Sequence, residues 1–251
     1  VTVTLKGTTV TITVEAPHTC EFVAGEVVAP TFEADGYTVY TCTCGKTENR
    51  DIVPALVAVA QIGEVKYETL AEAIAAAQAG DTVLVYEGTY AVPSMKAGIT
   101  IEGVGNVLFE GTLTGTLENL TMKNIHIKGG NAQRWAYAKG DLVFENVTFE
   151  ATSVYALHFD GISADANLLY KNCTIIGWAA LGGSPASCTF EGCTIKGNGA
   201  YGVIRTYFDT TIENCTFDVA NVNPNDAYQD GIHAVEGAEV VVDNCTNVNG
   251  D

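Results

Sequence analysis

The sequence is poor in positive charge: Lys and Arg number 12 against 30 Asp and Glu, which gives a formal charge of −18. A surface with this balance repels the phosphate backbone of nucleic acids and the headgroups of anionic lipids. We therefore expect no nucleic-acid partner and no binding to membrane surfaces. The same acidity suits a secreted or wall-exposed protein, and it also suits the binding of divalent cations.

The chain also lacks an apolar run of about 18 residues and a secretory leader, although apolar residues make up 47% of it. We therefore expect a large core and no membrane insertion. The sequence starts at Val1 rather than at Met and stops directly after its last repeat. This pattern is typical of a fragment of a secreted or cell-wall-attached protein, with signal and anchor outside it, and we expect a monomer.

One short phrase, typified by Phe144-Glu-Asn-Val-Thr-Phe149, occurs six times after Leu117. Its third letter is Asn in every copy but one, and successive third letters are 22, 26, 20, 22 and 30 residues apart. Self-similarity at this period is typical of a solenoid. The third letters are Asn124, Asn146, Asn172, Gly192, Asn214 and Asn244.

Apolar residues alternate on both sides of the third letter, as in Leu142 and Phe144 before Asn146 and Val147 and Phe149 after it. This period of two predicts two strands, each with one buried face. They meet at a corner because Asn, like Gly, tolerates a left-handed backbone. A third strand follows a loop of variable length. We therefore predict an all-β fold, a parallel β-helix of about eight coils.

The phrase has two features that imitate chemical motifs. It matches the Asn-x-Thr glycosylation pattern, but the matches share one repeat column, so the corner explains them better. Its Cys residues occupy inward positions, so we expect free thiols in the core rather than disulfides. The glycosylation matches are Asn119, Asn146, Asn172, Asn214 and Asn244, and the inward cysteines are Cys173, Cys188, Cys193, Cys215 and Cys245.

Residues 1–56 predict a separate, small β-rich module. Residues 1–14 alternate as a β-hairpin with a turn near Lys6 and Gly7. Residues 18–56 contain Gly36-Tyr37, Cys42-Thr-Cys44-Gly45 and Val53-Pro-Ala-Leu56. This segment resembles a small repeat that is common in surface proteins of gut-dwelling Gram-positive bacteria. It departs from that repeat at Phe32, where the family usually has Cys.

The module offers one candidate metal site, made of His18, Cys20, Cys42 and Cys44. Three thiolates and an imidazole are suitable ligands for zinc. The Cys-x-Cys spacing is tighter than the usual Cys-x-x-Cys. A disulfide from Cys20 to Cys42 or Cys44, or no bond at all, are the alternatives.

Residues 57–251 form the predicted β-helix. After a linking strand at 57–67, residues 68–79 predict an amphipathic helix with Thr69 as N-cap and Gly80 as its end. The Leu70…Ala73-Ile74 pattern, with Gly88-Thr-Tyr90 after it, resembles the start of pectin-lyase-like right-handed β-helix proteins. The resemblance covers residues 67–247 and implies a right-handed helix whose open end is capped by residues 68–79.

That superfamily includes pectate lyases, polygalacturonases, pectin methylesterases and adhesins without enzymatic activity, so the fold does not decide the function. Its lyases use an Arg base and a calcium ion held by several carboxylates. Its polygalacturonases use Asp-Asp and Gly-His-Gly motifs, and both motifs are absent from this sequence. Their absence argues against glycoside hydrolysis.

The third strands carry aromatic residues with Arg, Asp and His between them, and stacking would align them as a stripe. Such faces hold sugars, because rings pack on pyranoses and polar groups bind hydroxyls. The alternative is that these residues pack into loops and form turns. The predicted ligand-binding residues are Arg134, Trp135, Tyr137, His158, Asp160, Trp178, Arg205, Tyr207, Tyr228, Asp230 and His233.

An enzyme on the same face would use His158, Asp160, Arg205, Asp230 and His233. A pair of catalytic carboxylates must lie about 5 to 9 Å apart. Asp160 and Asp230 lie roughly three coils apart, which places them about 14 Å apart at the usual strand spacing. This separation argues against catalysis.

Residues 218–230 contain oxygen ligands of the type that calcium prefers. They are Asn221, Asn223, Asn225 and Asp226. A calcium ion bound there is therefore a further expectation.

The sequence leaves three hypotheses for the function. The first is a cell-surface adhesin or ligand-binding module for a glycan or host surface ligand, the second a polysaccharide-degrading lyase or hydrolase, and the third a structural spacer.

Overall fold

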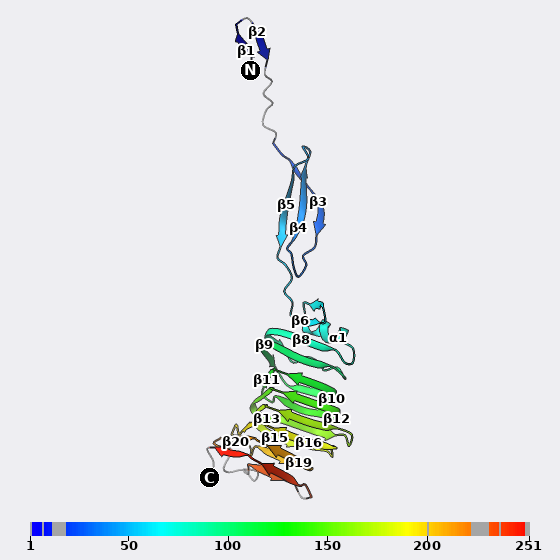
Figure 1. Cartoon of the computed structure of the whole chain (residues 1–251), viewed down its shortest axis with the longest axis vertical. Coiled ribbons are helices and arrows are strands. Elements are labelled where there is room, and N and C mark those ends of the chain that lie inside the picture. Colours follow the sequence, from blue (N-terminus) through cyan, green and yellow to red (C-terminus); the bar gives the residue numbers. More distant parts are fainter. Residues whose placement is uncertain are drawn as a thin grey trace. The chain divides into compact units, whose positions relative to one another are not determined.

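The computed structural model describes residues 2–6, 8–11, 19–199, 201–221, 231–235 and 237–248. The chain divides into two compact units, Val1–Val57 and Ala58–Asp251. The first consists of small antiparallel sheets, and the second is a stack of parallel strands (Figure 1). His18, Asn223, Asn225, Asp226, Tyr228 and Asp230 lie outside the described residues.

In the first unit, β1 (Thr2–Leu5) and β2 (Thr8–Thr11) form an antiparallel hairpin, and Lys6 between them has φ +49°. The predicted hairpin and its turn are thereby confirmed for the described residues. A three-stranded antiparallel sheet follows, made of β3 (Phe22–Val28), β4 (Gly36–Cys42) and β5 (Thr47–Val53).

This sheet has almost no core of its own. Among the described residues of the first unit, Cys42 is the only buried apolar side chain, with 2% of its surface exposed. Val23 and Val27 are 68% and 74% exposed. The sheet therefore has little apolar burial to stabilise it.

The second unit begins with two short antiparallel strands and a cap. The linking segment forms β6 (Ala60–Ile62) and β7 (Val65–Tyr67), not the single strand predicted for 57–67. The cap is α1 (Leu70–Ala76), which is shorter than the predicted 68–79. Thr69 is the N-cap as predicted: its Oγ1 accepts a hydrogen bond from the Glu72 amide at 3.2 Å.

Helix α1 ends before Gly80 because Ala77 already has an extended backbone, with ψ 144°. Asp81 holds the chain beyond it, since its carboxylate accepts a hydrogen bond from the Gln78 amide at 2.7 Å. Leu70, Ala73 and Ile74 are buried in the core beneath the cap. The cap thus shields the apolar end of the stack.

The parallel stack is built from strands that return to the same position in each coil, as Figure 1 shows. Full turns number about six, against the about eight coils predicted. The strands are β8 (Thr82–Ala91), β9 (Thr100–Glu110), β10 (Leu113–Lys123), β11 (His126–Gly129), β12 (Gln133–Glu145), β13 (Thr148–Ile162), β14 (Asn167–Lys171), β15 (Thr174–Leu181), β16 (Ser187–Glu191), β17 (Thr194–Lys196), β18 (Ile204–Thr206), β19 (Thr210–Glu213), β20 (Thr216–Asp218), β21 (Ile232–Ala234), β22 (Val240–Asp243) and β23 (Thr246–Val248).

The register follows the repeat phrase. The apolar residue two positions before each corner pairs with its counterpart in the next coil, which makes one inward column along the stack. Within it, the ring of Tyr170 stacks on Phe144 and Phe190, with centroids 5.1 and 4.6 Å apart. The column is Met122, Phe144, Tyr170, Phe190, Ile212 and Val242.

The corners have the backbone that the sequence predicts. All five corner Asn residues have φ between +47° and +55°, and Gly192 has φ +64°. Two amide contacts join neighbouring corners: Asn146 donates to Asn124 at 3.2 Å, and Asn244 donates to Asn214 at 2.6 Å. Gly192 has no side-chain amide, so the ladder of Asn side chains is interrupted there.

The thiols of the second unit lie in the stack as free cysteines, as predicted. Cys173, Cys188, Cys193 and Cys215 are buried, and Cys245 is partly exposed. None of the helices in the described residues is long and apolar enough to cross a membrane.

Candidate functional site

The third strands of successive coils bring several predicted site residues into one column. His158 of β13 pairs with Ala180 of β15, Ala180 with Arg205 of β18, and Arg205 with His233 of β21. In β13, β15 and β18 the residues on either side of this column are buried, so the column faces outward there. The structure therefore brings His158, Arg205 and His233 into one column, with the buried Ala180 between the first two.

A hollow of about 390 Å³ opens on this surface. We call the residues in and around it the aromatic face. They are Arg134, Trp135, Tyr137, Tyr155, His158, Asp160, Trp178, Tyr201, Arg205 and Tyr207.

Three rings stack in and beside the hollow, and two of them, Tyr155 and Trp178, line it. Tyr155 stacks on Trp178 with centroids 5.4 Å apart, and Trp178 lies 4.4 Å from the ring of Tyr201. Trp178 lines the hollow but is only 7% exposed, because its ring is packed between those of Tyr155 and Tyr201. Tyr155 lines the hollow, and Tyr201 lies next to it through its contact with Trp178.

Two guanidinium groups lie over rings of the face. The Cζ of Arg134 lies 4.8 Å from the Trp135 ring centroid and 5.1 Å from that of Tyr155. The Cζ of Arg205 lies 4.8 Å from the Tyr207 ring. Cation–π contacts of this kind hold guanidinium groups in place against the rings.

Trp135 combines an exposed ring with a strained backbone. It is 50% exposed and has φ +55°, the left-handed region that bulky residues seldom occupy. Such strain costs about 1–3 kcal/mol and clusters at functional sites. The strain turns the indole outward, beside His158, at a centroid distance of 4.8 Å.

His158 lies between the rings of Trp135 and Tyr155, whose centroid is 4.5 Å from its own. Burial lowers its pKa, while Asp160 raises it and Arg134 lowers it further, so the imidazole is neutral at pH 7. Its Nδ1 is buried and has no hydrogen-bond partner within the described parts of the chain. A neutral imidazole here can donate to or accept from a ligand hydroxyl.

Gln133 fixes the backbone of His158. It is 1% exposed; its Nε2 donates to the His158 carbonyl at 2.6 Å, and its Oε1 accepts from the His158 amide. Sequence reasoning did not select Gln133; the only signal for it is a polar residue at an inward position. It is a positioning residue for the aromatic face.

Asp160 is the only carboxylate that lines the hollow within the described residues. Tyr137, 49% exposed, donates its hydroxyl to Asp160 Oδ2 at 2.9 Å, and this bond raises the pKa of Tyr137. The bond leaves the other carboxylate oxygen free to accept from a ligand.

Some predicted residues cannot be placed on this face. Tyr228 and Asp230 lie outside the described residues, so the separation of the two predicted carboxylates is not defined. Of the predicted calcium ligands, only Asn221 is described, and it is exposed.

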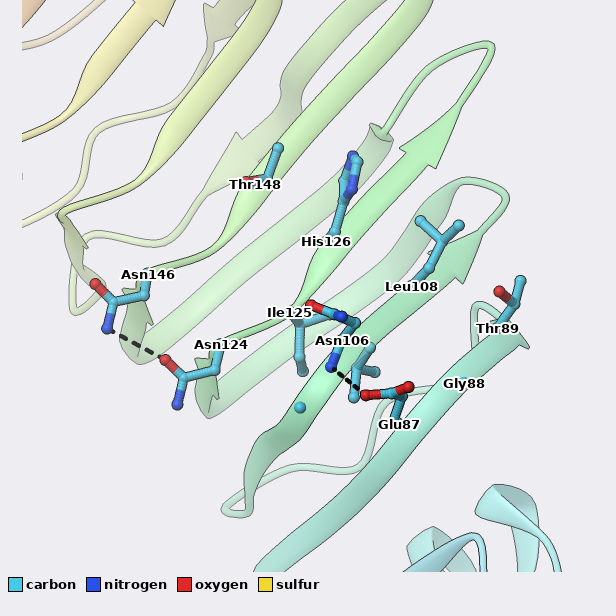
Figure 2. Close-up of a pocket in the computed structure, with 12 residues that line it drawn as sticks. Glu87, Gly88, Thr89, Asn106, Leu108, Asn124, Ile125, His126, Asn146 and Thr148 are labelled. Carbon is cyan, nitrogen blue, oxygen red and sulfur yellow. Dashed lines mark hydrogen bonds between the residues drawn. The ribbon is translucent and has the colours of Figure 1, made fainter.

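A second hollow, of about 620 Å³, lies beside the Asn corners (Figure 2). Its polar lining includes Glu87, Asn106, Asn124, His126 and Asn146, and the Asn106 amide donates to Glu87 at 3.5 Å. Its lining contains His126 but no Phe, Tyr or Trp among the described residues. It is larger than the hollow of the aromatic face but offers fewer groups that would hold a ligand.

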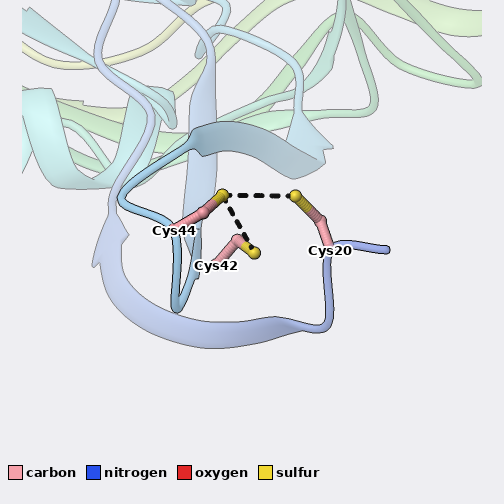
Figure 3. Close-up of side chains that lie close together, drawn as sticks. All are labelled: Cys20, Cys42 and Cys44. Atoms are coloured by element: carbon pink, nitrogen blue, oxygen red, sulfur yellow. Dashed lines mark hydrogen bonds between the residues drawn. The ribbon is translucent and has the colours of Figure 1, made fainter. Parts of the chain in front are cut away.

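The first unit contains the metal-type ligands. Sγ of Cys44 lies 3.4 Å from Sγ of Cys20 and 3.3 Å from Sγ of Cys42, and all three are free thiols (Figure 3). The three sulfurs lie within 4.8 Å of one another. His18, the fourth predicted ligand, lies outside the described residues.

Comparison with known proteins gives one match, to the family described as "right handed beta helix region". The match covers residues 75–217, more than half of the 251-residue chain. No curated protein and no solved structure matches the sequence. The handedness expected from the resemblance to pectin-lyase-like proteins is thereby confirmed. The chain, with its cap, its Asn corners and its stack of parallel strands, belongs to the right-handed β-helix family.

Proposed function

We propose that this chain is a glycan-binding module of a secreted or cell-surface protein, and that the aromatic face is its binding site. The observation that carries the proposal is the convergence of flat rings and guanidinium groups around one hollow. Trp135 and Tyr207, 50% and 46% exposed, present ring faces to solvent, and Arg134 and Arg205 lie against them. Rings bind the apolar faces of pyranoses, and the Arg donors bind hydroxyl or carboxylate groups.

The surroundings of the hollow favour binding over hydrolysis. Hydrolysis of a glycosidic bond needs two carboxylates about 5 to 9 Å apart, and Asp160 is the only one among the described lining residues. Asp160 is also held by the Tyr137 hydroxyl. A lyase would need several carboxylates for calcium, and the described lining does not supply them.

An anionic sugar fits this face best. The chain as a whole carries a charge of −18, yet Arg134 and Arg205 place two positive charges at the hollow against one carboxylate. A uronate or sialic acid carboxylate would be recognised by the planar N–H pairs of Arg. A neutral glycan would gain only the stacking contribution.

The experiment is a glycan array with acidic and neutral glycans, followed by calorimetric titration of the best ligand. We expect binding to be weakened at least tenfold by Trp135→Ala and by Arg205→Ala. Val104→Ala is the matched control, since Val104 is 42% exposed on β9 outside the aromatic face.

Two results would overturn the proposal. Absence of binding to every glycan on the array would favour a structural spacer. Release of unsaturated products from a uronate polymer, lost in Arg205→Ala, would favour a lyase instead.

A further inference from the structure

The thiol cluster of the first unit is fixed by its backbone. Phe22 pairs with Cys42 across β3 and β4, which brings the chain just before β3 alongside the end of β4. A tight turn follows, in which the Gly45 amide donates to the Cys42 carbonyl at 2.8 Å and Gly45 has φ +85°. This turn folds Cys44 back toward Cys20. Main-chain bonds, rather than bonds between sulfurs, therefore bring the three thiols together.

The spacing of the sulfurs suits a metal ion. Tetrahedral zinc with Zn–S bonds of about 2.3 Å separates its sulfurs by about 3.8 Å. The two closest pairs are 3.3 and 3.4 Å apart, and all three sulfurs lie within 4.8 Å. Shifts of about 0.5–1 Å per sulfur pair would therefore produce one face of a tetrahedron. A disulfide needs about 2.05 Å and joins only two sulfurs, so the third thiol would remain unused beside it.

The first unit also needs a stabilising element besides its sheet. Its only buried apolar side chain among the described residues is Cys42 itself, while Ile52 and Val53 are 56% and 50% exposed. Domains of this size without a core are usually held by disulfides or by a metal ion. The cluster joins the start of β3, the end of β4 and the turn before β5, so a bound ion would link all parts of the sheet.

We propose that Cys20, Cys42 and Cys44 bind a zinc ion as three thiolate ligands, and that this ion stabilises the first unit. Thiolates select zinc over the hard cations calcium and magnesium. Cys42 is buried and Cys44 is exposed, so the fourth coordination position faces the open side of the cluster. This inference is independent of glycan binding, because the cluster and the aromatic face belong to different units.

The first experiment measures ligation directly on the full chain. Protein purified with a non-thiol reductant and freed of metal is titrated with Co²⁺ and then with Zn²⁺. We expect one Co²⁺ per chain with thiolate-to-cobalt charge-transfer bands, displaced by Zn²⁺. Cys20→Ser, Cys42→Ser and Cys44→Ser should each weaken zinc binding at least 100-fold. Cys245→Ser, a partly exposed thiol of the β-helix, is the matched control and should bind as the wild type does.

The second experiment tests stabilisation without any substitution. Arg50 lies in β5, so trypsin cleavage after it reports opening of this sheet. Free zinc at 100 times its Kd should slow that cleavage about 100-fold, because a ligand that binds only the folded state lowers the open population in proportion.

Three results would overturn the inference. The first is a cobalt spectrum without charge-transfer bands. The second is zinc binding that the three Ser variants leave unchanged. The third is a native mass two hydrogens lower, with the lost hydrogens mapped to a disulfide among these cysteines.

Discussion

Replacement of Tyr170 by Phe should stabilise the β-helix. Tyr170 is fully buried, and its ring stacks between Phe144 and Phe190 in the inward column. Its hydroxyl has no hydrogen-bond partner in the described residues. Burial raises the pKa of this phenol well above its ordinary value, so the group is neutral at every practical pH.

The magnitude follows from two opposing contributions. A buried polar group without a partner costs about 1–3 kcal/mol relative to water. Removing one oxygen forfeits a few dispersion contacts of about 0.1–0.2 kcal/mol each, or about 0.5 kcal/mol together. Tyr170→Phe should therefore raise the free energy of unfolding by about 1–2 kcal/mol. For a unit of this size, that corresponds to an increase in Tm of about 3–6 °C.

The assay is thermal unfolding followed by tryptophan fluorescence. Both Trp residues, Trp135 and Trp178, lie in the second unit, so the signal reports the β-helix and not the small sheets. The matched control is Phe190→Tyr, which introduces a hydroxyl at the next position of the same column. It should lower the free energy of unfolding by about 1–3 kcal/mol.

A lower Tm for Tyr170→Phe would refute the reasoning. It would mean that the hydroxyl makes a favourable hydrogen bond, for which a buried water is the physical candidate. A higher Tm for Tyr170→Phe together with an equally lower Tm for Phe190→Tyr would support a column that is apolar throughout.

Three further expectations concern other parts of the β-helix. Asn146→Ala should lower the free energy of unfolding by about 1–2 kcal/mol, because Ala at φ +54° is strained. Asn146→Gly loses the same side-chain amide but tolerates this backbone, so it should lower the free energy of unfolding by less. Equal losses of stability for the two variants in denaturant titrations would refute the role of the corner. Trp135→Ala should leave Tm almost unchanged while it weakens glycan binding at least tenfold, because the half-exposed indole contributes little burial and Ala keeps the same left-handed backbone. A large fall in Tm would make Trp135 a structural residue. The hydrogen bond from Lys128 lowers the pKa of Glu150, so the Glu150 carboxylate stabilises the fold above its unfolded pKa of about 4.5, and this contribution disappears as the pH falls through its folded pKa. In Glu150→Gln, the free energy of unfolding should therefore fall less steeply with decreasing pH. An unchanged pH dependence of stability would contradict this prediction.

The sequence predicted the architecture because each coil repeats the same local signals. Alternation before and after Asn146 defines two strands, and the Asn itself predicts the positive φ between them. Thr69 predicted the start of the cap. The predicted end of the cap was wrong. The Asp81 carboxylate accepts a hydrogen bond from the Gln78 amide, and helix propensities do not reveal this contact.

The site was less predictable, for reasons of geometry. Position on a third strand correctly placed His158 and Arg205 in one column. It did not show that the rings of Tyr155 and Trp178 stack on each other, because a one-residue irregularity after Tyr155 in β13 changes which face a side chain occupies. The role of Gln133 depends on a hydrogen bond to a backbone 25 residues away, which no local pattern reveals.

The Asn corners have a consequence for how such a molecule changes length. Each corner returns the backbone to the same direction, so one coil, such as residues 172–191, is a self-contained segment that can be duplicated without altering its neighbours. Every added coil would advance the stack by about 4.8 Å. The outward surface of the third strands would grow by the same increment. Adding or removing whole coils therefore changes the length of this surface in fixed increments, which allows it to match the repeat spacing of a polymeric ligand.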